Sequence, residues 1–154
     1  MKANYGGSYD VSDDFGRPAK EWRFDEPNRV IKEFPGGVGN RQCVALVQTL
    51  LDMPSTKRWF EDTNGTSVYG NHALPQGTVI ATFVGGKYLS MPNGNHAAIY
   101  IKQIPKGILV IDQWIHEGKV KPPSFREIHD DPKATRSNYA PAFSAVRTSS
   151  LTRR

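Results

Sequence analysis

A single cysteine lies where a nucleophile would be expected, at the start of a strongly apolar segment. Asn40 is a good N-cap and Pro54 would end a helix, so residues 40–51 are predicted to form a buried helix. The dipole and the free N–H groups of a first helical turn favour an anion, which helps the Cys43 thiol to ionise and can hold a tetrahedral oxyanion. The alternative for Cys43 is a buried structural cysteine, the usual role of a lone one.

A histidine follows at the mouth of a predicted strand. His96 comes directly after the turn-forming residues 92–95 and begins strand 96–101. An imidazole in this position is partly exposed and can exchange protons near neutral pH. The other histidines lack this context and are interpreted as surface residues: His72, His116 and His129. None of the histidines has the helical spacing of metal ligands, and one cysteine cannot build a structural zinc site, so neither a metal nor a cofactor is expected.

The third candidate is a carboxylate on the next predicted strand. This predicted strand, 108–114, is expected to pair through residues 107–113 with strand 96–101 across a five-residue loop. Asp112 would then directly face His96, with Cβ atoms about 5 Å apart, and would orient the imidazole and stabilise its charged form. A shift of one residue would place Gln113 there instead. Asp112 is favoured because a charged group suits an imidazolium better.

The order of these residues indicates a reaction class. A cysteine at a helix start, a histidine on a following strand and an orienting residue on the next strand is the order of papain-like cysteine peptidases. The Cys43 backbone N–H, with help from Gln42, would bind the oxyanion. The small pair Ala97-Ala98 fits this arrangement, because the helix must lie close to the histidine strand.

The remaining elements predict an α+β domain, in which one buried helix packs on an antiparallel sheet. Residues 1–38 are rich in Gly and Pro and are expected to be loop with at most a short helix. Residues 116–141 are polar and are expected to be an excursion loop. Further expected elements are a short helix from Ser55 through Phe60 and the strands 78–84 and 142–146.

Length and composition further limit the classes of protein to which this chain can belong. The chain of 154 residues is expected to be a single catalytic domain, 1–154, and its one cysteine excludes an intrachain disulfide. No apolar run approaches a membrane span, and residues 1–14 show no secretory signal, so neither membrane insertion nor Sec export is expected. Residues 76–154 carry a net charge of +6 against −1 for residues 1–75. A basic nucleic-acid-binding module is the non-enzyme alternative, but it lacks a recognisable motif and nucleic acid is not the expected partner.

Several segments resemble known cell-wall amidases. Residues 41–47 resemble the nucleophile segment of CHAP and NlpC-type amidases, and residues 94–100 resemble their histidine strand. A closer similarity, over roughly residues 36–115, is to the type VI secretion amidase effectors, in particular the branch that cleaves peptidoglycan cross-links. That similarity adds Trp59 and the segments 68–70, 77–83 and 111–114. Gln42 and Val44-Ala45 depart from the Asp and Ser-Gly that flank the cysteine of NlpC-type enzymes, which favours the CHAP-like and effector side.

The resemblance implies a papain-like cysteine amidase that hydrolyses peptide stems of Gram-negative peptidoglycan. The favoured branch cleaves the D-Ala–meso-diaminopimelate cross-link, and sister branches cleave the γ-D-Glu–meso-diaminopimelate bond. Such effectors pass from the cytoplasm of the producer through the type VI secretion machinery into the periplasm of a recipient cell, and a cognate immunity protein blocks the cleft. A phage-type endolysin is the alternative within the enzymes. Lys119, Lys121 and Arg126 in the expected excursion loop would either pair with stem carboxylates or remain solvated.

Overall fold

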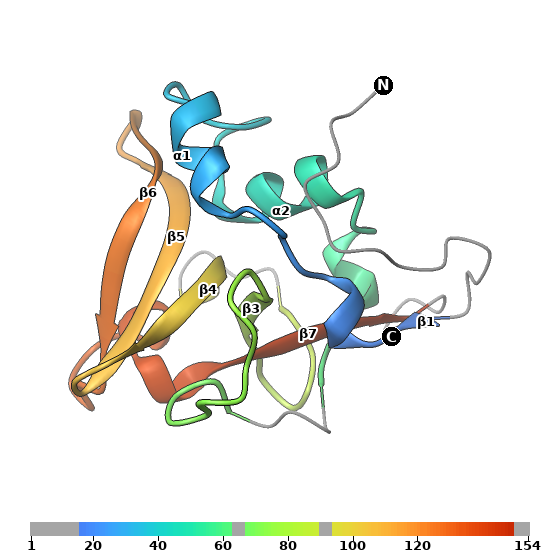
Figure 1. The fold of residues 1–154 in the computed structure, drawn as a ribbon, viewed down its shortest axis with the longest axis vertical. Coiled ribbons are helices and arrows are strands. Elements are labelled where there is room, and N and C mark those ends of the chain that lie inside the picture. The colour runs from blue at the N-terminus through green and yellow to red at the C-terminus, as the bar shows by residue number, and fades with distance from the viewer. Residues whose placement is uncertain (1–15, 63–66, 90–93, 150–154) are drawn as a thin grey trace.

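One antiparallel sheet organises the protein (Figure 1). The computed structural model describes residues 16–62, 67–89 and 94–149. The strands follow the order β1-β7-β3-β4-β5-β6, and β2 pairs with β7. The α+β class predicted from the sequence is therefore confirmed. In chain order the elements are β1 Gly16–Arg17, η1 Ala19–Glu21, α1 Asn28–Glu33, α2 Cys43–Leu51, η2 Thr56–Arg58, β2 Trp59–Glu61, β3 Val79–Thr82, β4 Ala97–Ile104, β5 Gly107–His116, β6 Lys119–His129, η3 Arg136–Asn138, η4 Ala140–Ala142 and β7 Phe143–Ser149.

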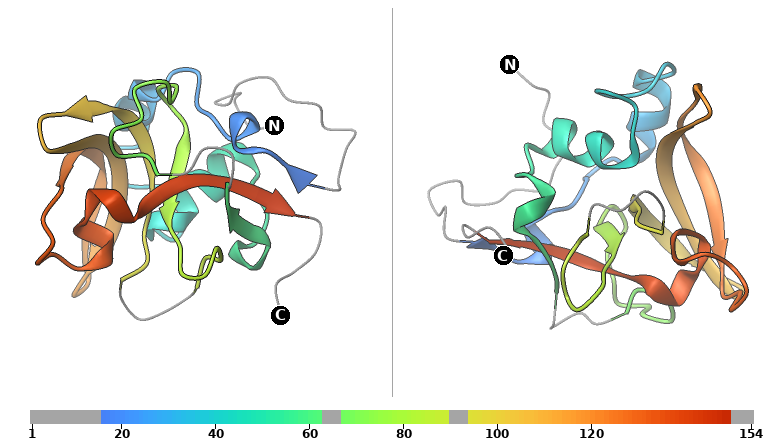
Figure 2. Two further views of the ribbon diagram at one scale, coloured as in Figure 1. Left: turned by 90° about the horizontal axis from the view of Figure 1, so that it is seen from below. Right: turned by 180° about the vertical axis from the view of Figure 1, so that it is seen from behind.

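Packing of α2 against one face of the sheet brings Cys43 to the strands. The helices α1 and α2 lie on the same side of the sheet, both in Figure 1 and in the view from behind in Figure 2. Successive residues of a strand point to opposite faces. Ile99 and Ile111 accordingly join Leu46 in the core beneath α2, whereas Tyr100 belongs to a second core on the other face. Burial of each such large side chain stabilises the fold by about 1.5–3 kcal/mol.

The nucleophile helix begins later than expected. It starts at Cys43, and the residue that caps it is Gln42 in an extended conformation, not Asn40. Arg41 has a left-handed backbone, φ 70°, which is incompatible with a continuous helix from residue 40. The Asn40 side chain instead accepts a hydrogen bond from the Gln42 N–H at 2.9 Å, closing a turn. Cys43 is therefore the first residue of α2, and the helix ends at Leu51, followed by the left-handed cap Asp52.

The hairpin of β4 and β5 is longer than predicted. Ile104 pairs with Gly107, so only Pro105 and Lys106 form the turn, and the five-residue loop expected at 102–106 is wrong. Lys106 adopts a left-handed conformation, φ 58°, as the second central residue of a type II turn does when proline is the first. The longer pairing also contains an irregularity between Tyr100 and Lys102, and this changes the register on the way to the site.

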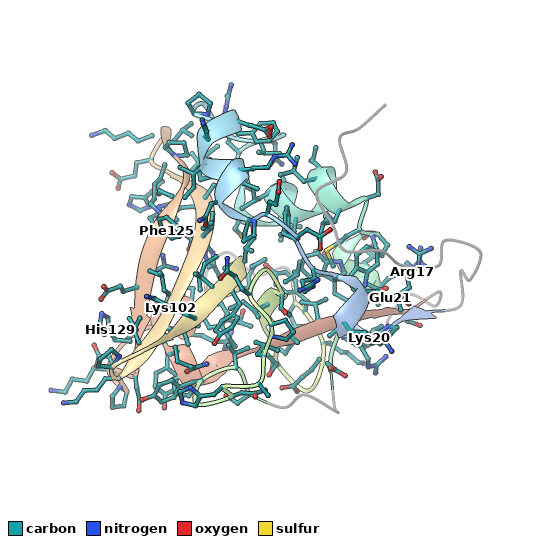
Figure 3. All side chains as sticks on the ribbon, viewed as in Figure 1. Arg17, Lys20, Glu21, Lys102, Phe125 and His129 are labelled. Carbon is teal, nitrogen blue, oxygen red and sulfur yellow. The ribbon has the colours of Figure 1, made fainter. Side chains whose placement is uncertain are left out.

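The prediction of an excursion loop at residues 116–141 is wrong, because this segment contains strand β6. Pro122-Pro123 suggested a loop, but β6 is an edge strand, where proline is tolerated. Lys121 pairs with Trp114 and Ser124 with Asp112, so β6 has one extra residue at the prolines and forms a bulge there. Phe125 and His129 lie along this outer strand (Figure 3).

Smaller differences occur around the other expected elements. The helix expected from Ser55 through Phe60 is a single 3-10 turn, after which Trp59 and Phe60 enter β2 and pair with β7. Trp59 is fully buried, and its indole N–H donates to the Pro54 carbonyl at 3.0 Å. Strand 78–84 is shorter, at Val79–Thr82, and strand 142–146 is displaced and longer, at Phe143–Ser149. In the described part of residues 1–38 the expected short helix is α1, but the segment also contains strand β1, which pairs with β7, and the 3-10 turn η1.

Candidate active site

A tight loop presents Cys43 beside the start of β4, a central strand of the sheet. Gly37, Gly39 and Arg41 all have positive φ, so the chain turns repeatedly before α2 begins. Gln42 caps the helix without a side-chain hydrogen bond to its first turn. The N–H groups at the start of α2 therefore remain available to an anion beside the half-buried Cys43.

His96 is held between three segments. Its backbone N–H donates to the Thr82 hydroxyl at 3.0 Å and its carbonyl accepts from the Thr82 N–H at 3.0 Å, which ties it to the end of β3. Its Nε2 lies 2.7 Å from Asp112 Oδ2. The ring also hydrogen-bonds Cys43, and Nδ1 is the nitrogen left for that contact. The imidazole thus links the thiol to the carboxylate.

Asp112 is fully buried, and its carboxylate contacts three side chains that are positively charged or can become so. One oxygen contacts His96, and the same oxygen accepts from Arg126 Nε at 2.8 Å. The other accepts from Lys121 Nζ at 3.1 Å. The contact with His96 is diagonal across the strands: Ile99 pairs with Ile111, so residue 98, not His96, stands opposite Asp112. The direct cross-strand pairing expected from the sequence is wrong, although the two side chains meet.

Burial and charge act against each other at these groups. Burial lowers the pKa of His96, but hydrogen bonds to Asp112 and Cys43 and their charges raise it overall to about 9. Burial raises the pKa of Asp112, but the hydrogen bond and charge of His96, with Arg126 and Lys121, bring it to about 2. Burial also raises the pKa of the Cys43 thiol, yet its contacts, led by the hydrogen bond with His96, lower it on balance. These directions favour a thiolate–imidazolium pair.

Two further groups contact the thiol that sequence reasoning did not identify. The Ala97 backbone N–H and the Tyr88 side chain both hydrogen-bond Cys43. Tyr88 is buried, packs edge-on against Trp59 at 5.3 Å between ring centroids, and receives a hydrogen bond from Asn95 Nδ2 at 3.4 Å. Burial and the charge of Cys43 raise the pKa of Tyr88, so its hydroxyl keeps its proton and donates to the thiolate. No local pattern marks Tyr88, because only folding brings it to Cys43.

Gln113 lies on the opposite face of β5 from Asp112 and is also fully buried. Its Oε1 accepts from the Val38 N–H at 2.9 Å, and its Nε2 donates to the Val38 and Gln42 carbonyls at 2.9 and 2.8 Å. Gln113 therefore holds the loop that presents Cys43, and Asp112 is the residue in contact with His96. The Gln42 side chain is exposed, and its backbone makes the hydrogen bonds described above.

A cavity opens beside His96. It has a volume of about 490 Å³ and is lined by His96, Trp114, His116, Arg126, Ser137 and Asn138. His72, His116 and His129 are exposed, as expected, but His116 also borders this cavity. Across residues 16–62, 67–89 and 94–149, no cluster of three or more His, Cys, Asp or Glu side chains could hold a metal ion. Nor does any helix in these ranges have the length and apolar character needed to cross a membrane.

The sequence of this chain is similar to a known protein family. A family model described as domesticated amidase effector 2 matches residues 19–146, most of the chain. The chain belongs to the domesticated amidase effector 2 family. A type VI secretion amidase effector 2 protein of Salmonella typhi is 40% identical over 97 residues, 60% of this chain and 71% of that protein. The domesticated amidase effector 2 of Ixodes scapularis is 40% identical over 84 residues, 51% of this chain and 54% of that protein.

A solved structure agrees with this membership in the domesticated amidase effector 2 family. It is a type 6 secretion amidase effector 2, with a TM-score of 0.69 and 32% identity, over 81% of this chain and 93% of the solved one. The predicted resemblance to type VI secretion amidase effectors and the papain-like fold are confirmed. The protein is an amidase, as the sequence predicted.

Proposed function

We propose that this amidase is an antibacterial toxin that hydrolyses the peptide stems of Gram-negative peptidoglycan, with Cys43 as nucleophile. The observation that carries the proposal is the continuous chain of contacts from Cys43 through His96 to Asp112, in a member of an amidase effector family. The roles assigned to these residues follow from their chemistry. In this proposal residues 1–154 act as one catalytic domain.

The mechanism follows from the placement of the protons. His96 Nδ1 accepts the thiol proton, and the Cys43 thiolate attacks the scissile carbonyl carbon. The tetrahedral oxyanion lies at the start of α2, where the Cys43 backbone N–H donates to it. His96 then gives its proton to the departing amine as the C–N bond breaks. Water attacks the thioester while His96 takes a proton from it, and the acid leaves as the thiolate is restored.

Asp112 orients the imidazole during both halves of this reaction. Its hydrogen bond to Nε2 fixes the ring so that Nδ1 faces Cys43. Because Asp112 carries its negative charge at neutral pH, it stabilises the imidazolium form electrostatically. Lys121 and Arg126 keep the carboxylate in place from β6.

The bond that we propose is the D-Ala–meso-diaminopimelate cross-link between two stems. The resemblance to the cross-link-cleaving branch supports it, and the γ-D-Glu–meso-diaminopimelate bond is the alternative. Delivery would run from the cytoplasm of a producing bacterium through the type VI secretion machinery into the periplasm of a recipient. A cognate immunity protein would protect the producer by covering the cleft around Cys43.

Digestion of purified Gram-negative muropeptides, followed by mass analysis, tests the proposal. Cross-link cleavage should convert tetrapeptide–tetrapeptide dimers into tetrapeptide monomers and leave existing monomers intact. Cys43→Ala and His96→Ala should each lose activity by several orders of magnitude, whereas His72→Ala should not. Release of disaccharide dipeptides from monomers would show that the γ-D-Glu bond is cut. A folded Cys43→Ala protein that still digests muropeptides would refute the mechanism.

A further inference from the structure

The segment that enters β4 supplies two groups that contact the Cys43 thiol. His96 hydrogen-bonds the thiol through its ring, and Ala97 does so through its backbone N–H. Asn95 acts one step further away, because its Nδ2 donates to the hydroxyl of Tyr88, which itself contacts the thiol. A small displacement of this segment would therefore change several contacts of the nucleophile at once.

The backbone just before β4 is held by hydrogen bonds from two other elements. Since β4 begins at Ala97, the residues before it are not part of a strand. From the end of β3, Thr82 holds the His96 backbone through two hydrogen bonds of 3.0 Å. From η3, Arg136 Nη1 donates to the Gly94 carbonyl at 3.0 Å. Gly94 has φ 84°, and a Cβ atom there would lie 3.2 Å from Arg136 Nη1, so glycine permits the close approach of the guanidinium.

The turn η3, which carries Arg136, is itself linked to the buried carboxylate of the site. Arg126 Nη1 donates to Asn138 Oδ1 at 2.8 Å, and its Nη2 contacts the Ser137 carbonyl at 3.5 Å. The same guanidinium donates from Nε to Asp112. Through η3, a continuous set of contacts thus runs from this carboxylate to the backbone that precedes the proposed general base.

Arg136 has few other interactions that could explain its place in the structure. Within the part of the chain that the structure describes, the Gly94 carbonyl is the one hydrogen-bond partner of its guanidinium. Arg136 is half-buried, and it is not among the residues that line the cavity beside His96. The contact with Gly94 is therefore the interaction through which Arg136 can affect the reaction.

We propose that Arg136 is a positioning residue for His96. By holding the Gly94 carbonyl, it keeps the entry to β4 in the place where the imidazole meets both the thiol and the buried carboxylate. A hydrogen bond from a guanidinium is charge-assisted and stronger than a neutral one, which suits it to hold a segment that no strand pairing fixes. The inference rests on the proposed role of His96 as proton acceptor, and it adds a residue that acts through the backbone and not on the substrate.

The rate at which iodoacetamide alkylates Cys43 tests this role without any peptidoglycan substrate. The chain has a single cysteine, so the pH profile of alkylation reports on this thiol alone. In the unmodified protein the reaction should begin well below the ordinary thiol pKa of 9.0, because His96 stabilises the thiolate. In folded Arg136→Gln protein the midpoint of the profile should move to higher pH, and the rate at the unmodified midpoint should fall by at least about threefold. Arg136→Lys retains a charged donor and should keep most of the unmodified profile.

Hydrolysis of muropeptides by the full chain gives a second readout. Arg136→Gln should lower kcat about tenfold and leave KM within about twofold, because the substituted residue does not border the cavity. Arg147→Gln is the matched control. It removes a guanidinium donor that lies 3.2 Å from the Glu61 carbonyl near the C-terminal end of β7, and it should leave both the alkylation profile and kcat unchanged.

The outcomes separate positioning from other roles of Arg136. An unshifted alkylation profile in Arg136→Gln would overturn the proposal. A higher KM with unchanged kcat would mean that Arg136 binds the substrate directly, and a loss of folding would mean that it supports the fold as a whole; either result would also overturn it. If the unmodified protein cleaves no muropeptide, the proposed action on peptidoglycan is refuted, whereas the alkylation profile still decides the role of Arg136.

Discussion

The reactivity of Cys43 depends on single groups that come from separate parts of the chain. Burial alone would keep the thiol protonated, but the hydrogen bond and charge of His96, the Ala97 N–H and the Tyr88 hydroxyl together lower its pKa. His96 in turn keeps its proton because Asp112 and Cys43 outweigh the effect of burial. The ion pair therefore exists between the lowered pKa of Cys43 and the pKa of His96, about 9.

Asp112→Asn should move the alkaline limit of activity to lower pH. Burial disfavours the charged imidazole, and the Asp112 hydrogen bond and charge are among the effects that overcome it. Without that charge His96 loses its proton at lower pH, so kcat/KM should begin to fall well below the pH of about 9 where the unmodified protein declines. A pH profile of muropeptide hydrolysis measures this. An unchanged alkaline limit would show that Asp112 does not stabilise the imidazolium.

The same pKa shift links His96 to folding stability. Because the pKa of His96 in the folded protein exceeds its ordinary value of 6.5, its contribution is fully present below pH 6.5 and is lost as the pH rises through about 9. The pKa of Asp112 is depressed from 3.8, so its contribution is present above that pH and is lost as the pH falls through about 2.

Tyr88→Phe should move the acid limit of activity to higher pH. The substitution removes one donor from the thiolate while keeping the ring that packs against Trp59. With less stabilisation of the anion, the pKa of Cys43 rises and kcat/KM declines sooner as the solution is acidified. The alkaline limit should change much less. Tyr69→Phe, which alters a tyrosine packed on the other core, is the control and should leave both limits in place.

Among the elements, the loop before α2 depends on one residue of β5. Gln113 satisfies the Val38 N–H and the carbonyls of Val38 and Gln42 from a fully buried position. These hydrogen bonds hold a segment whose backbone includes the left-handed Arg41. The start of α2, and with it the position of Cys43, therefore depends on β5 through Gln113.

Gln113→Leu should destabilise the protein and misplace the nucleophile. It leaves a buried N–H and two carbonyls without their partner, which should lower the free energy of unfolding by about 2–4 kcal/mol. Urea denaturation measures the loss, and muropeptide hydrolysis below the transition should also be weakened. Gln76→Leu makes the same chemical change at an exposed position and should alter stability by no more than about 0.5 kcal/mol. Equal stability of the two variants would refute the role of Gln113.

At the scale of the whole molecule, we expect the proposed reaction to kill Gram-negative cells only when the protein is in the periplasm. Peptidoglycan lies outside the inner membrane of a Gram-negative cell, so the protein should lyse such cells when a Sec signal directs it to the periplasm. Without the signal, expression should be tolerated. Cell density and viable counts after induction measure both outcomes.

Periplasmic Cys43→Ala protein is the matched control and should be harmless at equal abundance. We expect this variant to keep the fold, and it keeps the positive charge of the molecule, so it separates hydrolysis from nonspecific binding to the cell wall. Equal killing from the cytoplasm would instead point to a target such as nucleic acid, the alternative raised by the basic half of the chain.

The sequence alone was sufficient to predict helices and strands whose pattern lies within one short segment. The apolar stretch with Cys43 at its start indicated a helix, and β-branched runs indicated the strand that begins directly after His96 and the strand that carries Asp112. These predictions succeed because helix and strand patterns arise from neighbours along the chain. The order of these residues, with the family resemblance, also led to the amidase class that the comparisons confirm.

The contacts between those segments required the folded chain. Asp112 reaches His96 diagonally because the register of β4 and β5 differs from the one that a five-residue loop would impose. Lys121 and Arg126 reach Asp112 from β6, a strand with a bulge at Pro122-Pro123. The composition of this segment had indicated a loop. Tyr88 meets Cys43 only after the sheet and α2 have packed. Register, bulges and packing depend on residues far apart in sequence, so no local pattern encodes them.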